Sequence, residues 1–299
     1  MSTNKHRTSH IGHQTSDLRL IECPRDAMQG LKEFIPTQKK AEYINALLKV
    51  GFDTIDFGSF VSPQAIPQMR DTADVLKLLD LNKAKSKLLA IIANQRGAED
   101  ACKFDEITYL GFPFSISETF QQRNTNSSIE ESLKRVEIIS DLCNKNKKKM
   151  LIYISMAFGN PYGDEWNKDI AIHWTEKLVK NFEVKIIALA DTVGVSNPEN
   201  ISYMFSCLIP EFPNVEFGAH LHTTPDLWKE KITAAVENGC YRFDCAINGF
   251  GGCPMAADKL VGNMPTENLL SFFREKNTEM DFTAFEQARK LAVKIFPAQ

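Results

Sequence analysis

The chain has 299 residues, of which 43% are hydrophobic and 24% are charged, and its formal net charge is −3. This composition indicates a globular protein with a large core, and the weak net charge argues against a nucleic-acid partner or an anionic membrane surface. No segment approaches the roughly 18 to 20 consecutive apolar residues that span a bilayer, so no membrane partner is expected.

Short apolar runs alternate with longer amphipathic stretches from residue 18 onward. Eight runs are predicted to be strands, and these are residues 18–22, 54–57, 88–93, 106–110, 150–155, 185–190, 215–221 and 241–247. Most of the intervening stretches have the spacing of one apolar helix face. The predicted helices include residues 37–50, 72–79, 128–144, 170–181, 198–208 and 227–238.

The order of these elements predicts the fold class. Apolar strands joined by helical crossovers indicate a parallel sheet whose two faces are covered. Eight such units in a chain of this length fit a closed α/β TIM barrel, (β/α)8, better than an open sheet. We therefore expect residues 18–299 to form one barrel domain, with extra helices within 266–296.

The ends of the chain and its cysteines suggest where the protein works. Residues 1–17 are polar and lack the apolar core of a signal peptide, so we expect a disordered extension there. The seven cysteines are scattered and form no CxxC pair. That pattern is typical of reduced thiols rather than a disulfide framework, and it favours a cytoplasmic protein.

In a TIM barrel, the residues after the carboxyl ends of the strands form the active face. Acids, imidazoles and a thiol fall at these positions, which hold Arg25, Asp26, Asp56, Ser59, Asp191, His220, His222 and Cys253. Random placement would not concentrate such groups on one rim. The sequence therefore predicts an active site at this end of the barrel.

The segment His220-Leu221-His222 is the sharpest local signal. Residues two apart in a strand point to the same side, so both imidazoles can bind one divalent ion. Asp26 would complete a mixed oxygen and nitrogen site that suits Mg²⁺, Mn²⁺, Co²⁺ or Zn²⁺. The alternative is a pair of histidines that loop carbonyls satisfy.

Three further residues each allow a catalytic and a structural interpretation. Arg25 can offset negative charge that develops on a substrate oxygen, or it can form a buried ion pair. Asp191 can hold that arginine or accept a substrate hydroxyl, or it can cap the following helix. Cys253 lies in a glycine-rich loop that can bring a proton donor over a site, although its spacing alone favours an unreactive thiol.

Several segments together resemble the hydroxymethylglutaryl-CoA lyase family. They are ECPRDAMQ at 22–29, SFVSP at 59–63, PQM at 67–69, NTNSSIEES at 124–132, ADTVG at 190–194, HLH at 220–222, GGCP at 251–254 and PTENL at 265–269. The likeness spans residues 18–275, and the segments follow the order of the family. The family resemblance implies a TIM-barrel lyase that acts on an acyl-CoA.

The resemblance implies cleavage of a 3-hydroxy-3-methylglutaryl thioester to acetyl-CoA and acetoacetate, as in leucine degradation. It implies a divalent ion, Mg²⁺ or Mn²⁺, with the ligands Asp26, His220, His222 and Asn263. Arg25 would stabilise the enolate, and Cys253 would protonate it. The other implied catalytic residues are Asp56 and Asp191, which would orient the arginine and help to move the hydroxyl proton, and His220. The implied substrate-binding residues are Arg25, Gln29, Ser59 and Asn124, and a homodimer is compatible with the resemblance.

The chain departs from the family pattern at a few positions. Asp56 stands where glutamate is usual, Ala27 where glycine is usual, Thr223 where aspartate is usual, and Asn160 where cysteine is common. The segment from Cys253 to Asn263 is one residue longer than usual. These changes bear on the substrate and the rate more than on the type of reaction.

Two other functions remain open at this stage. One is a Claisen-condensing synthase of the isopropylmalate or citramalate type, and the other is an inactive barrel that serves in binding or assembly. Cys253 in its glycine-rich loop favours the lyase over the synthase, as does a chain that stops soon after the barrel. The intact set of Arg25, Asp26, the two histidines and Cys253 argues against an inactive barrel.

Overall fold

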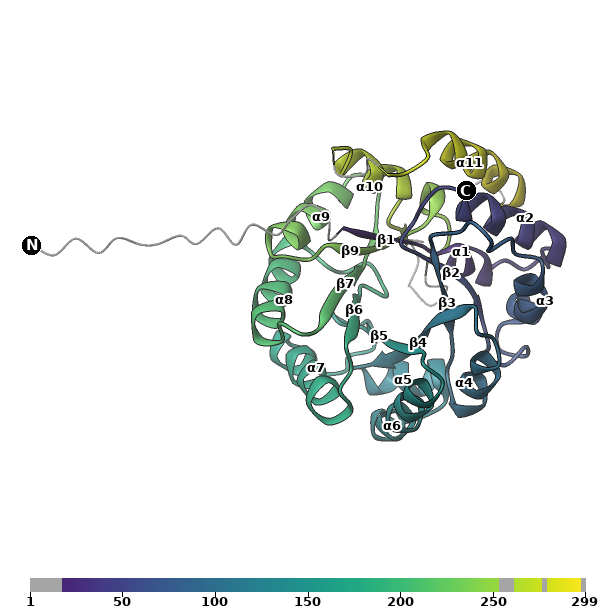
Figure 1. Ribbon diagram of the computed structural model, residues 1–299. Helices are drawn as coiled ribbons and strands as arrows, with labels where there is room; N and C mark the ends of the chain where they lie inside the picture. The colour runs from purple at the N-terminus through teal and green to yellow at the C-terminus, as the bar shows by residue number, and fades with distance from the viewer. Residues whose placement is uncertain (1–17, 253–260, 276–278, 297–299) are drawn as a thin grey trace, which may run out of the picture.

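The computed structural model describes residues 18–252, 261–275 and 279–296. Its centre is a closed barrel of eight parallel strands, which confirms the predicted fold class (Figure 1). The barrel strands, in order around it, are β1 (Arg19–Glu22), β2 (Thr54–Ser59), β3 (Lys87–Ile91), β4 (Ile107–Ser115), β5 (Lys149–Ser155), β6 (Ile186–Ala190), β7 (Glu216–His220) and β9 (Arg242–Cys245). Direct pairing of β1 with β9 closes the ring, because Arg19 lies opposite Arg242 and Glu22 lies opposite Cys245.

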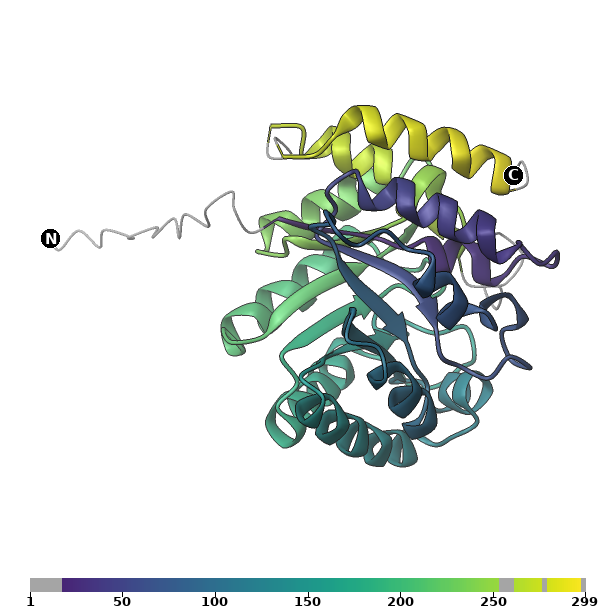
Figure 2. The same ribbon diagram turned by 45° about the vertical axis from the view of Figure 1, so that its right-hand side comes forward.

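Helices surround the barrel on its outside (Figure 1). They are α1 (Pro24–Gln29), α2 (Thr37–Leu48), α3 (Thr72–Lys77), α4 (Gln95–Cys102), α5 (Glu118–Thr125), α6 (Ile129–Lys145), α7 (Lys168–Phe182), α8 (Pro198–Glu211), α9 (Trp228–Glu237), α10 (Thr266–Phe272) and α11 (Phe282–Ile295), with short 3-10 turns η2 (Pro67–Met69) and η3 (Ile247–Gly249). The last helix, α11, packs along α2, which is early in the sequence (Figure 2). Within the described residues, no helix is both long and apolar enough to cross a membrane.

Apolar side chains fill two regions. The larger one lies between the barrel and its helices, and the smaller one lies inside the barrel. Inward-pointing residues of the strands make up the inner cluster, which contains Ile21, Cys23, Leu89, Ile91, Tyr109, Leu151, Tyr153, Ile186 and Ala188. A packed interior of this kind leaves the strand ends, rather than the barrel axis, as the place for chemistry.

The helices α1, α4 and α5 were not predicted, although the short α3 was. The helix α1 has six residues and begins with Pro24, and α4 has eight residues without a large apolar side chain, so neither gives a strong signal of a helix. Because α1 follows β1 directly, Arg25 and Asp26 lie on a helix rather than in a loop. Asp56 lies in the middle of β2 and not at its end. The expected disordered extension at 1–17, and Cys253, lie outside the described residues.

A small second sheet sits at the rim of the barrel. It consists of β8 (His222–Thr223) and β10 (Gly262–Asn263), which run antiparallel. The register places Asn263 opposite His222. Two of the expected metal ligands, 41 positions apart in the sequence numbering, are thereby fixed against each other by backbone pairing.

Candidate metal centre

Three side chains from opposite ends of the chain converge at the rim. Asp26 comes from α1, His220 from the end of β7 and His222 from β8. One potential ligand atom from each residue lies within 4.8 Å of the others. Two imidazoles and one carboxylate at this spacing form the mixed donor set that divalent ions such as Mg²⁺, Mn²⁺ and Zn²⁺ accept.

The protonation states of these side chains suit a cation. Both ring nitrogens of His222 are buried and have no hydrogen-bond partner among the described residues, which is costly unless another ligand satisfies them. Burial, together with the neighbouring His220, lowers the pKa of His222 to about 4, so its imidazole is neutral. Although burial opposes it, the charge of Arg25 and the two histidines lowers the pKa of Asp26 to about 2. A neutral imidazole and an ionised carboxylate are the forms that bind metals.

Asn263 lies beside this cluster, as the family resemblance implied. Its Nδ2 donates to Asp26 Oδ2 at 2.8 Å and to the carbonyl of Phe250 at 2.9 Å. Gly251 packs against the same group with a φ of +85°, and a Cβ there would lie 2.8 Å from the carbonyl oxygen of Asp26. The glycine-rich loop therefore begins directly on the metal-binding residues, in a conformation that requires glycine.

Arg25 is held rigidly next to the cluster. Its Nη2 and Nε donate to Asp56 Oδ2 at 2.5 and 3.0 Å, and its Nη1 donates to Asp26 Oδ1 and to Gln29 Oε1 at 2.8 and 2.9 Å. Burial opposes the charge of the guanidinium, but Asp56 and Asp26 outweigh it and raise the pKa of Arg25 above its usual value. The shorter aspartate at position 56 thus reaches the arginine on two nitrogens, so the glutamate usual in the family is not needed for this contact.

Asp191 has partners other than the arginine. Its carboxylate accepts hydrogen bonds from the amide and hydroxyl of Ser196, at 3.0 and 2.5 Å, and from Lys231 Nζ at 2.9 Å. Among the described residues, no hydrogen bond or ion pair joins Asp191 to Arg25. The expected role of Asp191 in orienting the arginine therefore has no contact to support it.

Lys231 is a residue that sequence reasoning missed. It lies on α9, its side chain is buried, and its ammonium also donates to the carbonyl oxygen of His222 at 2.8 Å. Lys231 therefore links the end of β6, through Asp191, to the backbone of an expected metal ligand. A single lysine on an amphipathic helix carries no local signal of such a contact.

The expected substrate-binding residues occupy different settings. Gln29 is bonded to Arg25 and Asp26, so it lies at the cluster. Ser59 is buried at the end of β2, and its hydroxyl donates to the carbonyl of Ile91 at 3.2 Å. Asn124 is exposed on α5. Their contacts with a substrate stay predictions. Asn160, where cysteine is common in the family, forms a turn, because its Oδ1 accepts hydrogen bonds from the amides of Tyr162 and Asp164.

Asp244 is a second residue that the sequence did not single out. It lies inside the barrel on β9 with a fully buried side chain, and its Oδ2 is 3.0 Å from His220 Nδ1. This contact leaves Nε2 of His220 as the nitrogen that can bind a metal. A carboxylate in this position fixes the tautomer and the orientation of a ligating histidine.

We expect Asp244→Asn to weaken Mn²⁺ binding about 10- to 100-fold, because such supporting groups typically contribute that much to metal affinity. Isothermal titration of the purified protein with Mn²⁺ alone measures the effect. The matched control is Asp53→Asn, which changes a half-buried aspartate just before β2, at the opposite end of the barrel. Equal affinities for the two variants would contradict the assigned role.

A buried carboxyl anchors the segment that carries Asn263. Glu22 ends β1, and it accepts hydrogen bonds from the hydroxyl of Thr266 at 2.6 Å and from the amide of Ile247 at 2.9 Å. Burial raises its pKa to about 8, although these hydrogen bonds oppose the shift. Glu22 thus joins the start of the barrel to both ends of the segment 247–266, within which the glycine-rich loop lies.

The raised pKa of Glu22 predicts a pH dependence of stability. The folded protein keeps this proton up to about pH 8, whereas the unfolded chain loses it near 4.5. The contribution of Glu22 to the free energy of unfolding is therefore complete below 4.5 and is lost as pH rises toward 8. The free energy of unfolding of Glu22→Gln should therefore rise, relative to that of wild type, by about 1.4 kcal/mol for each pH unit across this window. Urea unfolding at a series of pH values tests this, with the exposed Glu106→Gln as control, and parallel profiles for Glu22→Gln and wild type would refute it.

The fold and the cluster define a TIM-barrel enzyme with a carboxylate and imidazole metal centre at the active rim. Residues 19–292 match the HMGL-like family model, and the chain belongs to this family. It is 32% identical over 247 residues to the hydroxymethylglutaryl-CoA lyase YngG of Bacillus subtilis, an alignment that covers 83% of this chain and 81% of that protein.

Two further similarities support the family assignment. The chain is 30% identical over 275 residues to the 3-hydroxy-3-isohexenylglutaryl-CoA/hydroxymethylglutaryl-CoA lyase of Pseudomonas aeruginosa, covering 91% of this chain and 90% of that protein. Among solved structures, an HMG-CoA lyase from Acinetobacter baumannii in complex with coenzyme A and 3-methylmalate superposes with a TM-score of 0.85 and 29% identity. That match covers 94% of this chain and 92% of the other. These relatives are lyases, which disfavours the synthase alternative.

Proposed function

We propose that this chain is a metal-dependent carbon–carbon lyase that cleaves 3-hydroxy-3-methylglutaryl-CoA to acetyl-CoA and acetoacetate. The observation that carries the proposal is the convergence of Asp26, His220 and His222 within 4.8 Å, with the guanidinium of Arg25 bonded to Asp26. A metal-ligand cluster and a fixed cation side by side are what a retro-Claisen cleavage requires, because negative charge passes from the hydroxyl oxygen to the thioester.

The reaction balances with one proton removed and one delivered. Loss of the proton on the C3 hydroxyl forms the ketone of acetoacetate as the C2–C3 bond breaks. The bonding electrons move to C2 as a thioester enolate, and a proton delivered to C2 gives acetyl-CoA. A divalent ion, Mg²⁺ or Mn²⁺, held by Asp26, His220, His222 and Asn263 would supply Lewis-acid chemistry at the substrate oxygens.

The protein's own side chains then have distinct tasks. Arg25 stabilises the enolate oxygen, since a fixed donor aimed at developing charge acts strongly in a buried site. Asp56 holds the guanidinium in place through its two bonds. His220, whose Nδ1 contacts Asp244, would hold the ion through Nε2, and the carboxyl of Asp56 is the group that we assign to help move the hydroxyl proton. We assign delivery of the proton to C2 to Cys253; Gly251, two residues before it, packs against Asp26 and Asn263.

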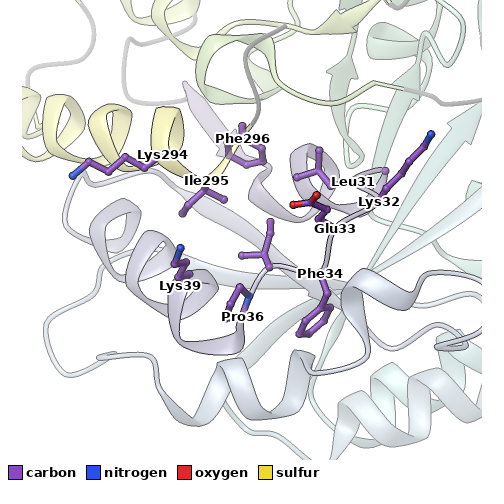
Figure 3. A pocket seen from close by; sticks show the side chains of 11 residues that line it. Leu31, Lys32, Glu33, Phe34, Pro36, Lys39, Lys294, Ile295 and Phe296 are labelled. Carbon is purple, nitrogen blue, oxygen red and sulfur yellow. The ribbon is translucent and has the colours of Figure 1, made fainter.

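We assign the coenzyme A portion to a cavity formed by the segment that follows α1. Its volume is about 660 Å³, and it is lined by residues 30–36, Lys39 and residues 294–296 (Figure 3). The lining combines apolar side chains, which suit the pantetheine arm, with lysines that suit its phosphates. The lining lysines are Lys32, Lys39 and Lys294.

The decisive test is an assay of acetyl-CoA release from 3-hydroxy-3-methylglutaryl-CoA with Mg²⁺ or Mn²⁺. We expect turnover that EDTA abolishes, and Cys253→Ala should lose most of it while still binding Mn²⁺. Cys207→Ala, on α8, is the matched thiol control and should keep full activity. Absence of turnover on this thioester, with turnover on the 3-hydroxy-3-isohexenylglutaryl thioester, would overturn the substrate but keep the reaction class.

A further inference from the structure

One wall of the cavity is a segment without helix or strand. Residues 30–36 connect α1 to α2, and most of the cavity lining comes from this segment, with the rest from Lys39 and the end of α11 (Figure 3). A loop forms no regular backbone hydrogen bonds within itself, so its buried N–H and C=O groups need partners elsewhere in the protein. The shape of the cavity therefore depends on what holds residues 30–36.

The side chain of Gln68 holds this segment at three points. Gln68 lies on the short turn η2 and is almost fully buried. Its Oε1 accepts a hydrogen bond from the amide of Ile35 at 2.9 Å. Its Nε2 donates to the carbonyl oxygens of Glu33 and Leu31, at 2.8 and 3.3 Å. One carboxamide thus satisfies one backbone donor and two backbone acceptors of the same wall.

Neighbours of Gln68 reinforce the same arrangement. Lys40 donates to the backbone carbonyl of Gln68 and to Asp71 Oδ1, so the turn itself is anchored to α2. The ring of Phe34 lies between two cations, with the guanidinium of Arg70 at 3.5 Å and the ammonium of Lys40 at 4.1 Å from its centroid. Residues 30–36 are therefore held by η2 and by Lys40 of α2.

We propose that Gln68 is a positioning residue for acyl-CoA binding, which acts by fixing residues 30–36 as the wall of the cavity. The inference rests on the proposed function for the identity of the ligand, but the wall and its anchor are independent of it. Gln68 is not one of the residues that we assign to the ion or to the reacting atoms. Its loss should therefore impair substrate binding more than the chemical step or metal binding.

The sharpest variant is Gln68→Glu, which keeps the shape of the side chain and replaces the donor group by an acceptor. The new oxygen would face the carbonyls of Leu31 and Glu33, so two attractive contacts become repulsive. Gln64→Glu is the matched control, because it makes the same change at an exposed position of the same loop. Gln68→Met, which removes the three bonds while keeping the volume, is the second variant.

Three measurements decide the proposal. For Gln68→Glu we expect a KM for the acyl-CoA at least tenfold above wild type, with kcat within a few-fold. Coenzyme A alone, titrated calorimetrically, should bind correspondingly more weakly, and Mn²⁺ alone should bind as in wild type. Amide hydrogen exchange of residues 31–35 should be faster in Gln68→Glu than in wild type. In Gln68→Met, the KM, the affinity for coenzyme A and the exchange rate should all change in the same direction as in Gln68→Glu. Gln64→Glu should match wild type throughout.

The outcomes separate this proposal from the proposed function. Unchanged KM and unchanged exchange of residues 31–35 in both Gln68 variants would overturn it, and so would a parallel loss of Mn²⁺ binding, because the effect should be confined to the cavity. If wild type fails to cleave 3-hydroxy-3-methylglutaryl-CoA, the proposed function fails. In that case the titration with coenzyme A and the exchange experiment still test the role of Gln68.

Discussion

Replacing Arg25 with lysine is expected to lower kcat by about 10²- to 10³-fold, the effect typical of losing one fixed donor to an oxyanion. The positive charge would remain, but the geometry would not. Four bonds from the guanidinium reach Asp56, Asp26 and Gln29 between 2.5 and 3.0 Å. A lysine has a single nitrogen on a flexible stem and cannot reproduce this planar set of contacts.

Steady-state kinetics at saturating Mn²⁺ measures the effect of Arg25→Lys. The matched control is Arg19→Lys at the start of β1, where the arginine is partly exposed and pairs with Glu216. We expect the control to keep its activity, since exposed ion pairs contribute little. More than a tenth of wild-type kcat in Arg25→Lys would rule out the proposed role. Recovery of activity at higher Mn²⁺ would instead point to a role in metal binding.

Replacing His222 with alanine is expected to abolish both turnover and the thermal stabilisation that Mn²⁺ confers. A ligand that binds only the folded protein stabilises it by about 2.7 kcal/mol at a concentration one hundred times its Kd. Wild type should therefore show a rise in Tm on adding Mn²⁺, and His222→Ala should show none. Both ring nitrogens of His222 are buried and have no hydrogen-bond partner in the described part of the chain. Losing them should therefore cost the metal-free protein no hydrogen-bond energy.

The exposed His173→Ala on α7 is the matched control, because it also removes one imidazole. Its Tm should rise with Mn²⁺ as in wild type. An equal Mn²⁺-dependent rise in His222→Ala would show that His222 is not a ligand. Inactivity of wild type with normal Mn²⁺ stabilisation would leave the metal site in place and remove only the proposed substrate.

Much of the barrel could be predicted because its signals are local. Each strand is a buried apolar run, and the longer helices have a clear apolar period. The short α1 and α4 escaped detection, since six or eight residues with few large apolar side chains give only a weak signal of a buried helix. The sequence interpretation placed Arg25 correctly after β1 but did not predict the helix on which it lies.

The candidate site was predictable to the extent that its residues sit at strand ends. Asp26, His220 and His222 were found in this way, and the family resemblance added Asn263. Asp244 and Lys231 were not predicted, because each is identified only by a contact with a residue distant in sequence. Asp244 contacts the ring of His220, and Lys231 donates to the carbonyl oxygen of His222. The sequence singled out Asp191 because it follows a strand. That position does not predict its hydrogen bonds with Ser196 and Lys231.

The closure of β1 against β9 has a consequence for how the protein acquires its activity. Asp26 and Asn263 are 237 positions apart, and Glu22 and Thr266 are 244 apart, yet both pairs are in direct contact. Contacts this distant in the chain form late in folding, because the loop entropy must be overcome first. A nascent or partly folded chain that lacks β9 and the segment after it would hold Asp26 without Asn263, and His220 without Asp244. The protein would then be inactive until β9 and the segment after it have joined the barrel.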